Sequence, residues 1–288
     1  MISIKRNTKG EKVKAKGILA KTHQYLKYKP NQKEDFKLSR SRFDEFMNCQ
    51  KCFYLRLVSG LQPANVPGWT LNTLTDTLLK KEFDECRTKQ KPHRLLIEEK
   101  LNHIIPYETK IIEDSKGREK QRIDIWRDSR HEGLRHRFKE TNIILQGGVD
   151  DVWYNTKTKE LIVVDYKSQH DTKEVTQNNY FDKPHKEGYK RQLDFYAYLL
   201  KGMGFNVAEE KYIYLVNAKE VDEGFHGKML FDEIIIKHES NIDYLEGQIQ
   251  NMVNTMNSTA IPSSDESCEN CAYARQFSHY FNFIYGDR

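Results

Sequence analysis

Residues Gly147–Gln169 read GGVDDVWYNTKTKELIVVDYKSQ, and this stretch decides the fold expected for the chain. Apolar and β-branched residues flank the polar segment Asn155–Lys159, which is typical of two short strands joined by a turn. Side chains alternate between the two faces of a strand, so Asp165 and Lys167 point to one face and Tyr166 to the other. The pattern predicts a β-hairpin whose second strand presents an aspartate and a lysine together.

The first strand of this hairpin begins with an acidic pair. The same alternation places Asp150 on one face with Gly148 and Val152, and Asp151 on the opposite face. One of the two can therefore meet Asp165 across the pair of strands, and we favour Asp150. The preceding glycine pair would let the backbone bend or a phosphate approach.

Two carboxylates that converge have a predictable chemistry. They repel each other, and burial raises their pKa values unless a cation lies between them. Carboxylate oxygens suit a hard ion such as Mg²⁺ or Mn²⁺, which also retains water and binds phosphate. A lysine two residues after the second aspartate can orient or deprotonate the attacking water, or neutralise charge on the phosphorus oxygens. The arrangement predicts metal-assisted hydrolysis of a phosphodiester bond.

These residues resemble the signature of the PD-(D/E)XK nuclease superfamily. Asp150 is followed fifteen residues later by Asp165-Tyr166-Lys167, and Val149 stands where the superfamily's name has proline. The resemblance implies that Asp150 and Asp165 hold the metal and that the Tyr166 carbonyl adds an oxygen. It also implies that Lys167 positions the water and stabilises the pentavalent phosphorus.

A helix expected over residues 187–200 carries the second part of the resemblance. Gln192 and Tyr196 stand at i and i+4, on a common side of that helix. They resemble the Q-x-x-x-Y motif of the RecB-like branch, which implies that they orient the active site and contact DNA. Residue by residue, other interpretations stay open, because strand Asp–Lys pairs are often exposed ion pairs, and helical Gln and Tyr are often surface and core residues.

The RecB-like branch takes a further metal ligand, a histidine or an acidic residue, from a helix upstream of the paired carboxylates. Leucines and Phe83 at helical spacing predict a helix over residues 71–90, and Asp76 lies at the margin of its apolar stripe. Asp76 is our candidate for this ligand, with Glu82 and His93 behind it. The alternative is a partly exposed aspartate without a function.

The order of the expected elements favours an α/β fold. Besides the hairpin, the pattern predicts a helix that begins at Ser39 and interprets Leu95–Ile97 as a short strand or loop anchor. Further strands are expected at residues 142–145, 211–217 and 229–236, and a helix at 239–257. A central mixed β-sheet flanked by helices follows. The resemblance implies the same restriction-endonuclease-like core.

The domain organisation follows from periodicity and charge. Apolar periodicity is weak before residue 36, so we expect a basic flexible arm over residues 1–36 and a single nuclease domain over 37–288. Within that domain we expect a helical or irregular part at 37–140, the catalytic core at 141–236, and a C-terminal helix with a closing Cys-x-x-Cys segment at 237–288.

Five cysteines include two Cys-x-x-Cys pairs, Cys49/Cys52 and Cys268/Cys271. This usage favours metal or redox chemistry in a reducing compartment over a disulfide framework. The pairs are too far apart for a local zinc ribbon. If the fold brings the chain ends together, they can form one tetrahedral site that suits zinc or an iron–sulfur cluster. Cys86 has no partner in the sequence and is expected in a helix.

The resemblance adds to this interpretation. Some RecB-like nucleases, among them helicase–nuclease subunits and CRISPR adaptation nucleases, join the ends of the nuclease domain with a [4Fe–4S] cluster, usually with one cysteine from the N-terminal side and three from the C-terminal side. This chain has two and two. We therefore expect an N-/C-terminal cysteine-rich helical staple holding a [4Fe–4S] cluster, with Zn²⁺ as the alternative. Buried structural thiols are the remaining interpretation.

Composition and charge bound the partners. The net charge is +5, and residues 1–33 and 116–139 are strongly basic, which suits a phosphate backbone, although a solvated tail would look the same. Trp126, among arginines, could stack on a base or lie in the core. No apolar run is long enough to span a membrane and no signal-peptide core is present, so a cytoplasmic protein without a membrane partner is expected.

The chain is thus expected to be an Mg²⁺- or Mn²⁺-dependent deoxyribonuclease. Its expected role is as an exonuclease or DNA-end processing enzyme in repair, recombination or defence, acting on single-stranded DNA or DNA ends. A helicase or another repair or defence protein is the protein partner we would look for, and the oligomeric state stays open. The alternative function is a catalytically silent nucleic-acid-binding module on the same fold.

Overall fold

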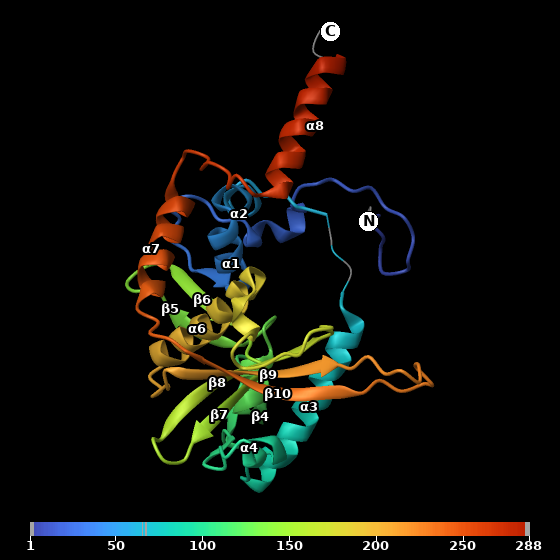
Figure 1. The fold of residues 1–288 in the computed structure, drawn as a ribbon. Coiled ribbons are helices and arrows are strands. Elements are labelled where there is room, and N and C mark those ends of the chain that lie inside the picture. Colours follow the sequence, from blue (N-terminus) through green and yellow to red (C-terminus); the bar gives the residue numbers. More distant parts are fainter. Residues whose placement is uncertain (1–2, 65, 67, 286–288) are drawn as a thin grey trace. The chain divides into compact units, whose positions relative to one another are not determined.

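The computed structural model of the chain describes residues 3–64, 66 and 68–285. These residues form two compact units (Figure 1). The cysteine unit comprises the described parts of residues 1–68 and 246–288, and the core unit comprises residues 69–245. The arm and the single nuclease domain expected from the sequence stay predictions.

A five-stranded mixed sheet is the centre of the core unit. Its strands lie in the order β10 (Phe231–Glu239), β9 (Glu210–Ala218), β8 (Glu160–Gln169), β7 (Asp151–Asn155) and β2 (Ile104–Pro106). β8 and β9 are parallel, with α6 (Glu187–Gly202) between them in sequence, and the other neighbours are antiparallel. The predicted hairpin, with Asp151 opposite Val164, and the predicted strands at 211–217 and 229–236 are confirmed.

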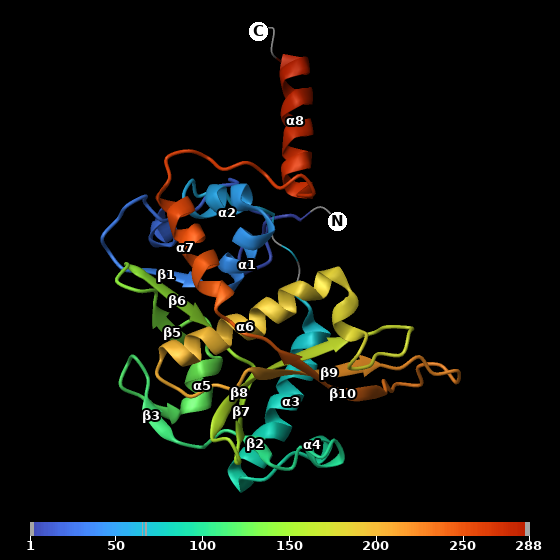
Figure 2. The ribbon, with the colours of Figure 1, turned by 60° about the vertical axis from the view of Figure 1, so that its left-hand side comes forward.

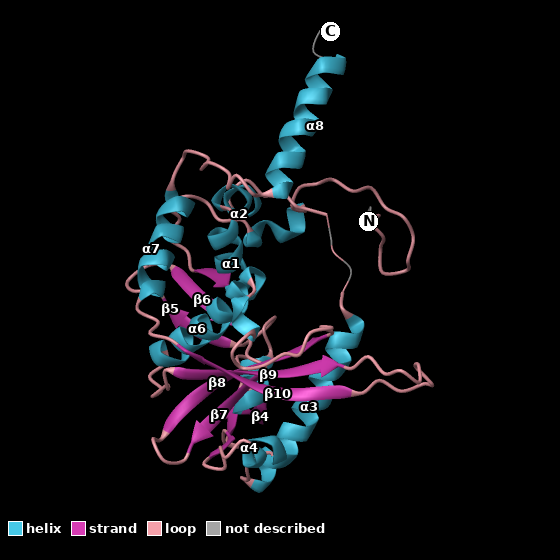
Figure 3. Ribbon diagram, viewed as in Figure 1, coloured by secondary structure: helices cyan, strands magenta, loops and turns pink. Residues whose placement is uncertain are grey.

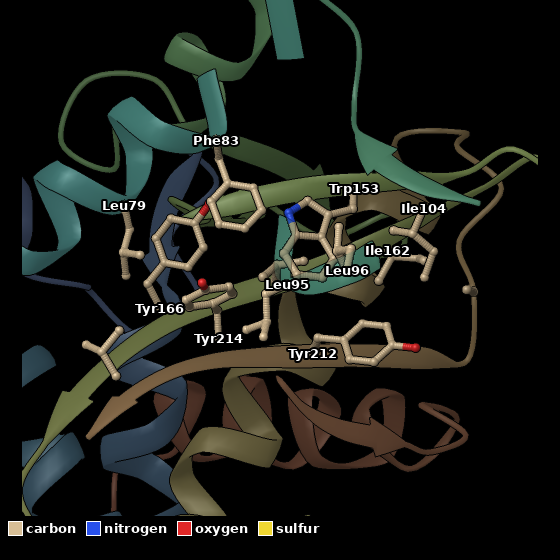
Figure 4. Packing of buried hydrophobic residues seen from close by; sticks show 13 residues of the cluster. Leu79, Phe83, Leu95, Leu96, Ile104, Trp153, Ile162, Tyr166, Tyr212 and Tyr214 are labelled. Atoms are coloured by element: carbon tan, nitrogen blue, oxygen red, sulfur yellow. The ribbon is translucent and has the colours of Figure 1, made fainter. Parts of the chain in front are cut away.

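Helix α3 (Thr70–Lys89) covers one face of this sheet. Its side chains Leu79 and Phe83 are buried among residues that alternate along β8, namely Ile162, Val164 and Tyr166 (Figure 4). The Phe83 ring lies 5.3 Å from the rings of both Trp153 and Tyr214, measured between centroids. Such a cluster of large aromatic rings fixes the helix against the strands, since each buried ring contributes a large apolar area.

Helix α6 lies on the opposite face, so the sheet has helices on both sides (Figures 1 and 2). Leu193, Ala197 and Leu200 are fully buried on this helix. The odd-numbered residues of β8 face this helix, which is shown by the hydrogen bond from Gln192 to Asp165. The α/β fold with a central mixed sheet and flanking helices is therefore confirmed.

The remaining elements of the core unit are short. They are α4 (Arg94–Glu98), β3 (Ile111–Glu113), β4 (Glu119–Gln121), α5 (Arg122–Arg127), β5 (Leu134–Arg137), β6 (Ile143–Gly147), and two 3-10 turns at Tyr180–Asp182 and Pro184–Lys186. β5 pairs with β6, and β3 pairs with β4. The expectation of a strand or loop at Leu95–Ile97 is wrong, because His93 caps a helix there by accepting a hydrogen bond from the Leu95 amide.

The cysteine unit is built mainly of helices (Figure 3). They are α1 (Arg40–Asn48), α2 (Gln50–Leu57), α7 (Tyr244–Asn257) and α8 (Glu269–Tyr285), with a 3-10 helix at Lys21–Leu26 and the strand β1 (Phe36–Ser39). Within the predicted arm, Tyr28 is buried and its hydroxyl donates to the Asn257 side chain at 2.8 Å. Among the described helices, none has the length and apolar character needed to cross a membrane.

Candidate functional site

Three predicted site residues meet on the α6 face of β8. Asp165 is 1% exposed, and its carboxylate forms an ion pair with the ammonium of Lys167, two residues further along the strand. The amide of Gln192 on α6 donates to Asp165 Oδ1 at 2.6 Å. The strand therefore supplies the aspartate and the lysine together, as the alternation predicts, and the helix fixes the orientation of the carboxylate.

Asp150 directly precedes β7 and reaches the same place. Its Oδ2 accepts the backbone N–H of Tyr166 at 3.0 Å, and its own carbonyl accepts a hydrogen bond from Arg127 Nε at 2.9 Å. These two contacts hold the residue by its side chain and by its backbone. The structure thus brings Asp150, rather than Asp151, beside Asp165.

The electrostatics of this group are those of a crowded pair of acids. Burial raises the pKa of Asp165, the Lys167 ammonium lowers it and Asp150 raises it, with a net rise to about 7. Burial also acts to raise the pKa of Asp150, but the ammonium groups of Lys80 and Lys167 outweigh it, and the pKa is lowered. Burial opposes the charge on Lys167, yet the two aspartates raise its pKa. A buried carboxyl that resists ionisation beside another carboxylate is a place where an added cation is stabilised.

The donor chemistry fits a hard divalent ion. Asp150 and Asp165 offer carboxylate oxygens, and a protein site for Mg²⁺ or Mn²⁺ uses one or two carboxylates, with water and substrate phosphate completing the coordination. The Tyr166 carbonyl lies on the same strand, between Asp165 and Lys167. The residues present therefore fit the ion that the family resemblance implies.

Asp76 lies close to this group but is separated from it by a lysine. Lys80 Nζ lies 2.8 Å from Asp76 Oδ2 and 3.4 Å from Asp150 Oδ1. Burial and the charge of Asp150 raise the pKa of Asp76, which Lys80 partly offsets. The alternatives lie elsewhere, because His93 Nε2 hydrogen bonds to Glu82 at 2.7 Å and the His93 ring stacks on Phe83.

Tyr196 packs beside the glycine pair that precedes Asp150. A methyl group placed on Gly147 would come within 2.5 Å of the Tyr196 ring, so only glycine leaves room for the ring there. A methyl group placed on Gly148 would meet Ser129 and the Arg127 carbonyl. The glycine pair is therefore explained by close packing, and the space beside it is filled by protein.

Asp151 lies on the other face and has partners of its own. It is fully buried, accepts a hydrogen bond from the Tyr166 hydroxyl at 2.7 Å, and is paired with Arg87. Arg127 lies 3.5 Å away and is held by Asp84. Sequence reasoning missed this network, although an aspartate facing the α3 side of the hairpin needs a buried cation.

A second lysine also lies near the site and was missed. Lys186 is buried, and its Nζ donates to Gln169 Oε1 at 2.6 Å. The Tyr189 ring lies between the two lysines, 4.9 Å from Lys167 Nζ and 5.0 Å from Lys186 Nζ. Burial, followed by the charge of Lys183, lowers the pKa of Lys186 to about 8. The sequence signal that could have identified Lys186 is its place between aromatic residues in the polar segment before α6.

The four predicted cysteines come together in the cysteine unit. Cys52 Sγ lies 3.5 Å from the sulfurs of both Cys268 and Cys271, and Cys49 Sγ lies 3.9 Å from that of Cys271. All four sulfurs lie within 4.8 Å of one another. Among the described residues, this is the group of three or more His, Cys, Asp or Glu side chains whose ligand atoms lie close enough together to hold one metal ion. The cluster joins the N- and C-terminal regions, as predicted.

The chemistry of this cluster fits a thiophilic metal. Burial raises the pKa of the Cys271 thiol, whereas backbone hydrogen bonds outweigh burial at Cys49 and lower its pKa to about 7. Four thiolates so close together need a cation, and four-sulfur coordination suits zinc or an iron–sulfur cluster. Cys86 lies in α3, as expected. A pocket of about 710 Å³ borders Cys52 and Cys268.

Trp126, the candidate for stacking on a base, is buried at 3% exposure on α5. Its ring is stacked with that of Tyr107, at a centroid distance of 5.9 Å, and meets Phe205 edge-on. The core interpretation of Trp126 is therefore the correct one.

Comparison with known proteins follows the same lines. A family model described as the PD-(D/E)XK nuclease superfamily matches residues 37–276. No curated protein matches the chain by sequence. Among solved structures, the chain is similar to one from Eubacterium rectale described as a "Putative exonuclease", at 11% identity and a TM-score of 0.41, over 92% of this chain and 94% of that chain. The family match includes every site residue named above, and the chain belongs to the PD-(D/E)XK nuclease superfamily.

Proposed function

We propose that the chain is a metal-dependent nuclease that hydrolyses phosphodiester bonds in DNA, of the RecB-like branch. The observation that carries the proposal is the meeting of Asp150, Asp165 and Lys167 at one place on the α6 face of the sheet, with the pKa of the buried Asp165 raised to about 7. Superfamily membership supports a nucleic-acid substrate. The Q-x-x-x-Y residues on α6 support the RecB-like assignment, since Gln192 bonds directly to Asp165.

Each residue has a proposed role. Asp150 and Asp165 would hold the Mg²⁺ or Mn²⁺ ion, with the Tyr166 carbonyl adding an oxygen, and Asp76 is a third carboxylate of the same region. The ion supplies Lewis-acid activation of the phosphate and lowers the pKa of water. Lys167 carries a positive charge toward the position of the scissile phosphate, where it can orient the water and offset developing negative charge. Gln192 fixes the Asp165 carboxylate.

Tyr196 acts less directly. It is buried and its ring fills the space beside Gly147, so we assign it the positioning of the Gly147–Gly148 segment that leads to Asp150. A contact between Tyr196 and DNA, as the resemblance implies, stays a prediction.

We propose that the four cysteines hold a [4Fe–4S] cluster, with Zn²⁺ as the alternative. The four sulfurs lie within 4.8 Å of one another, which matches the spacing that Zn–S bonds of about 2.3 Å give in a tetrahedral site, whereas a [4Fe–4S] cluster would require the sulfurs to move further apart. Anaerobic purification followed by metal analysis and an absorption spectrum distinguishes them. A brown protein with about four irons supports the cluster, and one zinc ion supports the alternative.

The substrate is a proposal at a further level of detail. We infer DNA ends or single-stranded DNA as the substrate, in repair, recombination or defence, with a helicase or another protein of these pathways as the partner. We also propose a cytoplasmic location, where thiols stay reduced and available to a metal. Cleavage of end-labelled linear DNA compared with closed circular DNA tests the exonuclease assignment.

A catalytically silent DNA-binding module is the alternative function. The experiment that separates the two is cleavage of DNA with Mg²⁺ or Mn²⁺ by the wild-type chain and by Asp165→Ala and Lys167→Ala. Cleavage that both substitutions abolish in folded protein supports the enzyme. Binding without cleavage under either ion supports the module.

A further inference from the structure

Lys80 stands between two of the carboxylates that the proposed function assigns to metal binding. It projects from α3, one helical turn after Asp76, and its ammonium lies 2.8 Å from Asp76 Oδ2 and 3.4 Å from Asp150 Oδ1. All three side chains are one-quarter to one-third exposed, so the group is open to ions from solvent. The position of Lys80 was not anticipated from the sequence.

The position of this lysine is set by the core of the unit. Leu79 and Phe83, on either side of it in sequence, are buried in the aromatic cluster under β8. The helix therefore cannot rotate Lys80 away from the sheet without disrupting that cluster. The side chain itself is flexible, since a lysine has four rotatable carbons. The position of the helix is thus fixed by the core, while the Lys80 side chain that reaches Asp150 can change its conformation.

The structure also offers this side chain another place to go. The surface of α3 beside Lys80 carries Thr77, Lys81, Asp84, Glu85 and Thr88. Asp84 is one turn further along the helix, at i+4, which is the spacing at which helical Lys and Asp side chains meet. Asp84 already pairs with Arg127 and Arg87, so a displaced Lys80 ammonium would share this carboxylate or turn toward solvent, without any change of the backbone.

We propose that Lys80 is a displaceable internal cation, which neutralises the Asp76–Asp150 pair before the divalent ion binds and lowers the affinity of the protein for that ion. The inference rests on the proposed function, because it concerns the same ion. Its physical basis is that one ammonium and one divalent ion compete for the same carboxylates, and that a nearby positive charge repels the ion. Lys80 would shift the dependence of activity to higher concentrations of the divalent ion.

The test is a direct measurement of Mn²⁺ binding to the full chain by calorimetry, without DNA. Lys80→Met removes the charge and keeps the apolar stem, and Lys80→Gln is a second version in case the first does not fold. Lys81→Met is the matched control, because Lys81 is the next residue and lies on the same helix surface, yet it is exposed and outside the Asp76–Asp150 pair. Asp150→Asn identifies which part of the Mn²⁺ binding belongs to this site.

The expected result is that Lys80→Met or Lys80→Gln lowers the Kd for Mn²⁺ by about tenfold, as removal of a unit charge a few ångströms away predicts, while Lys81→Met changes it by less than about twofold. In thermal melting, the rise in Tm on adding Mn²⁺ should be larger for Lys80→Met than for the wild type.

An unchanged or weaker Mn²⁺ affinity in both Lys80 variants would overturn the inference and leave the proposed nuclease standing. If the wild type shows no Mn²⁺ binding that Asp150→Asn removes, and no cleavage of DNA, the nuclease proposal itself fails along with the inference. The two failures are therefore separable, because the first is a difference between variants and the second is a property of the wild type.

Discussion

Two aspartates that are neighbours in the sequence have opposite surroundings in this molecule. Asp151 is fully buried and is met by two arginines and a tyrosine hydroxyl. Asp150 lies with Asp165 on the other side of the hairpin. Its neighbouring cations among the described residues include Lys80 and Lys167. The charge of Asp151 is compensated by groups within the protein, whereas the Asp150–Asp165 pair can accept a further positive charge.

The difference shows how strand alternation can divide structure from chemistry. A buried carboxylate with two guanidinium partners has no capacity left for an ion, whereas a carboxyl whose pKa is raised to about 7 by burial and by a second acid gains from one. Tyr166 links the two places, since its backbone N–H bonds to Asp150 and its hydroxyl to Asp151. The network around Asp151 therefore holds the strand from which the proposed site is built.

The largest expected effect is on catalysis. Lys167→Ala should lower the rate of DNA cleavage by about 10²–10⁴-fold, because it removes the charge that faces the developing oxyanion. Lys186→Met, which alters the neighbouring lysine on the other side of the Tyr189 ring, is the comparison and should retain most of the activity. Single-turnover cleavage at saturating Mn²⁺ measures both. Equal loss in the two variants would contradict the assigned role of Lys167.

The next effect is on stability. Asp151→Asn should lower the free energy of unfolding by about 3 kcal/mol, because it removes the buried carboxylate partner of Arg87 and leaves only the more exposed Asp84. Urea denaturation monitored by circular dichroism measures the change. If Asp151→Asn is as stable as the wild type, the view of Asp151 as the structural member of the acidic pair is wrong.

Asp165→Asn should have the opposite sign in metal-free protein. The pKa of Asp165 is raised in the folded state, so the stability that its protonated form contributes is present at low pH and is lost as the pH rises toward about 7. At pH 8 the asparagine variant should be more stable than the wild type by about 2 kcal/mol, with the difference shrinking toward pH 4. Melting curves across this range in the presence of a chelator test it, and a less stable variant at pH 8 would count against the raised pKa.

The smallest effect concerns pH and the ion together. At limiting Mn²⁺, cleavage should weaken by up to about tenfold per unit as the pH falls below 7, because the ion must then displace a proton from Asp165. Saturating Mn²⁺ should shift the decline to lower pH. A profile that is flat from pH 5 to pH 8 at limiting Mn²⁺ would show that Asp165 does not titrate in this range.

Local patterns in the sequence predicted much of the fold, and the reason is visible in individual elements. The apolar run before Asp165 and the helical spacing around Phe83 reflect burial on one face, so the hairpin, α3 and α6 are where the periodicity places them. The helix α4 was not predicted from the sequence, because it is only five residues long and depends on a histidine cap. The helix α8 was not expected from the sequence, and its aromatic residues Tyr273, Phe277 and Phe281 form one stripe at i, i+4 and i+8 that is exposed.

The site was predictable only in part. The spacing of Asp150, Asp165 and Lys167 within one hairpin places them together by strand geometry alone, and Gln192 follows from the motif on α6. Lys80 and the pairing of Arg87 with Asp151 depend on how α3 crosses the sheet, which no local spacing specifies. The meeting of cysteines more than 200 residues apart could be inferred from their two-and-two pattern, but not their mutual distances.

Cleavage of end-labelled DNA by the wild type and by Asp165→Asn, with Mg²⁺, with Mn²⁺ and with a chelator, tests the central claim most directly. Circular dichroism of both proteins under the same conditions confirms that they are folded. Cleavage by the wild type only when a divalent ion is present, and none by Asp165→Asn, is the predicted result. Cleavage that persists in the chelator, or in Asp165→Asn at the wild-type rate, would contradict the account.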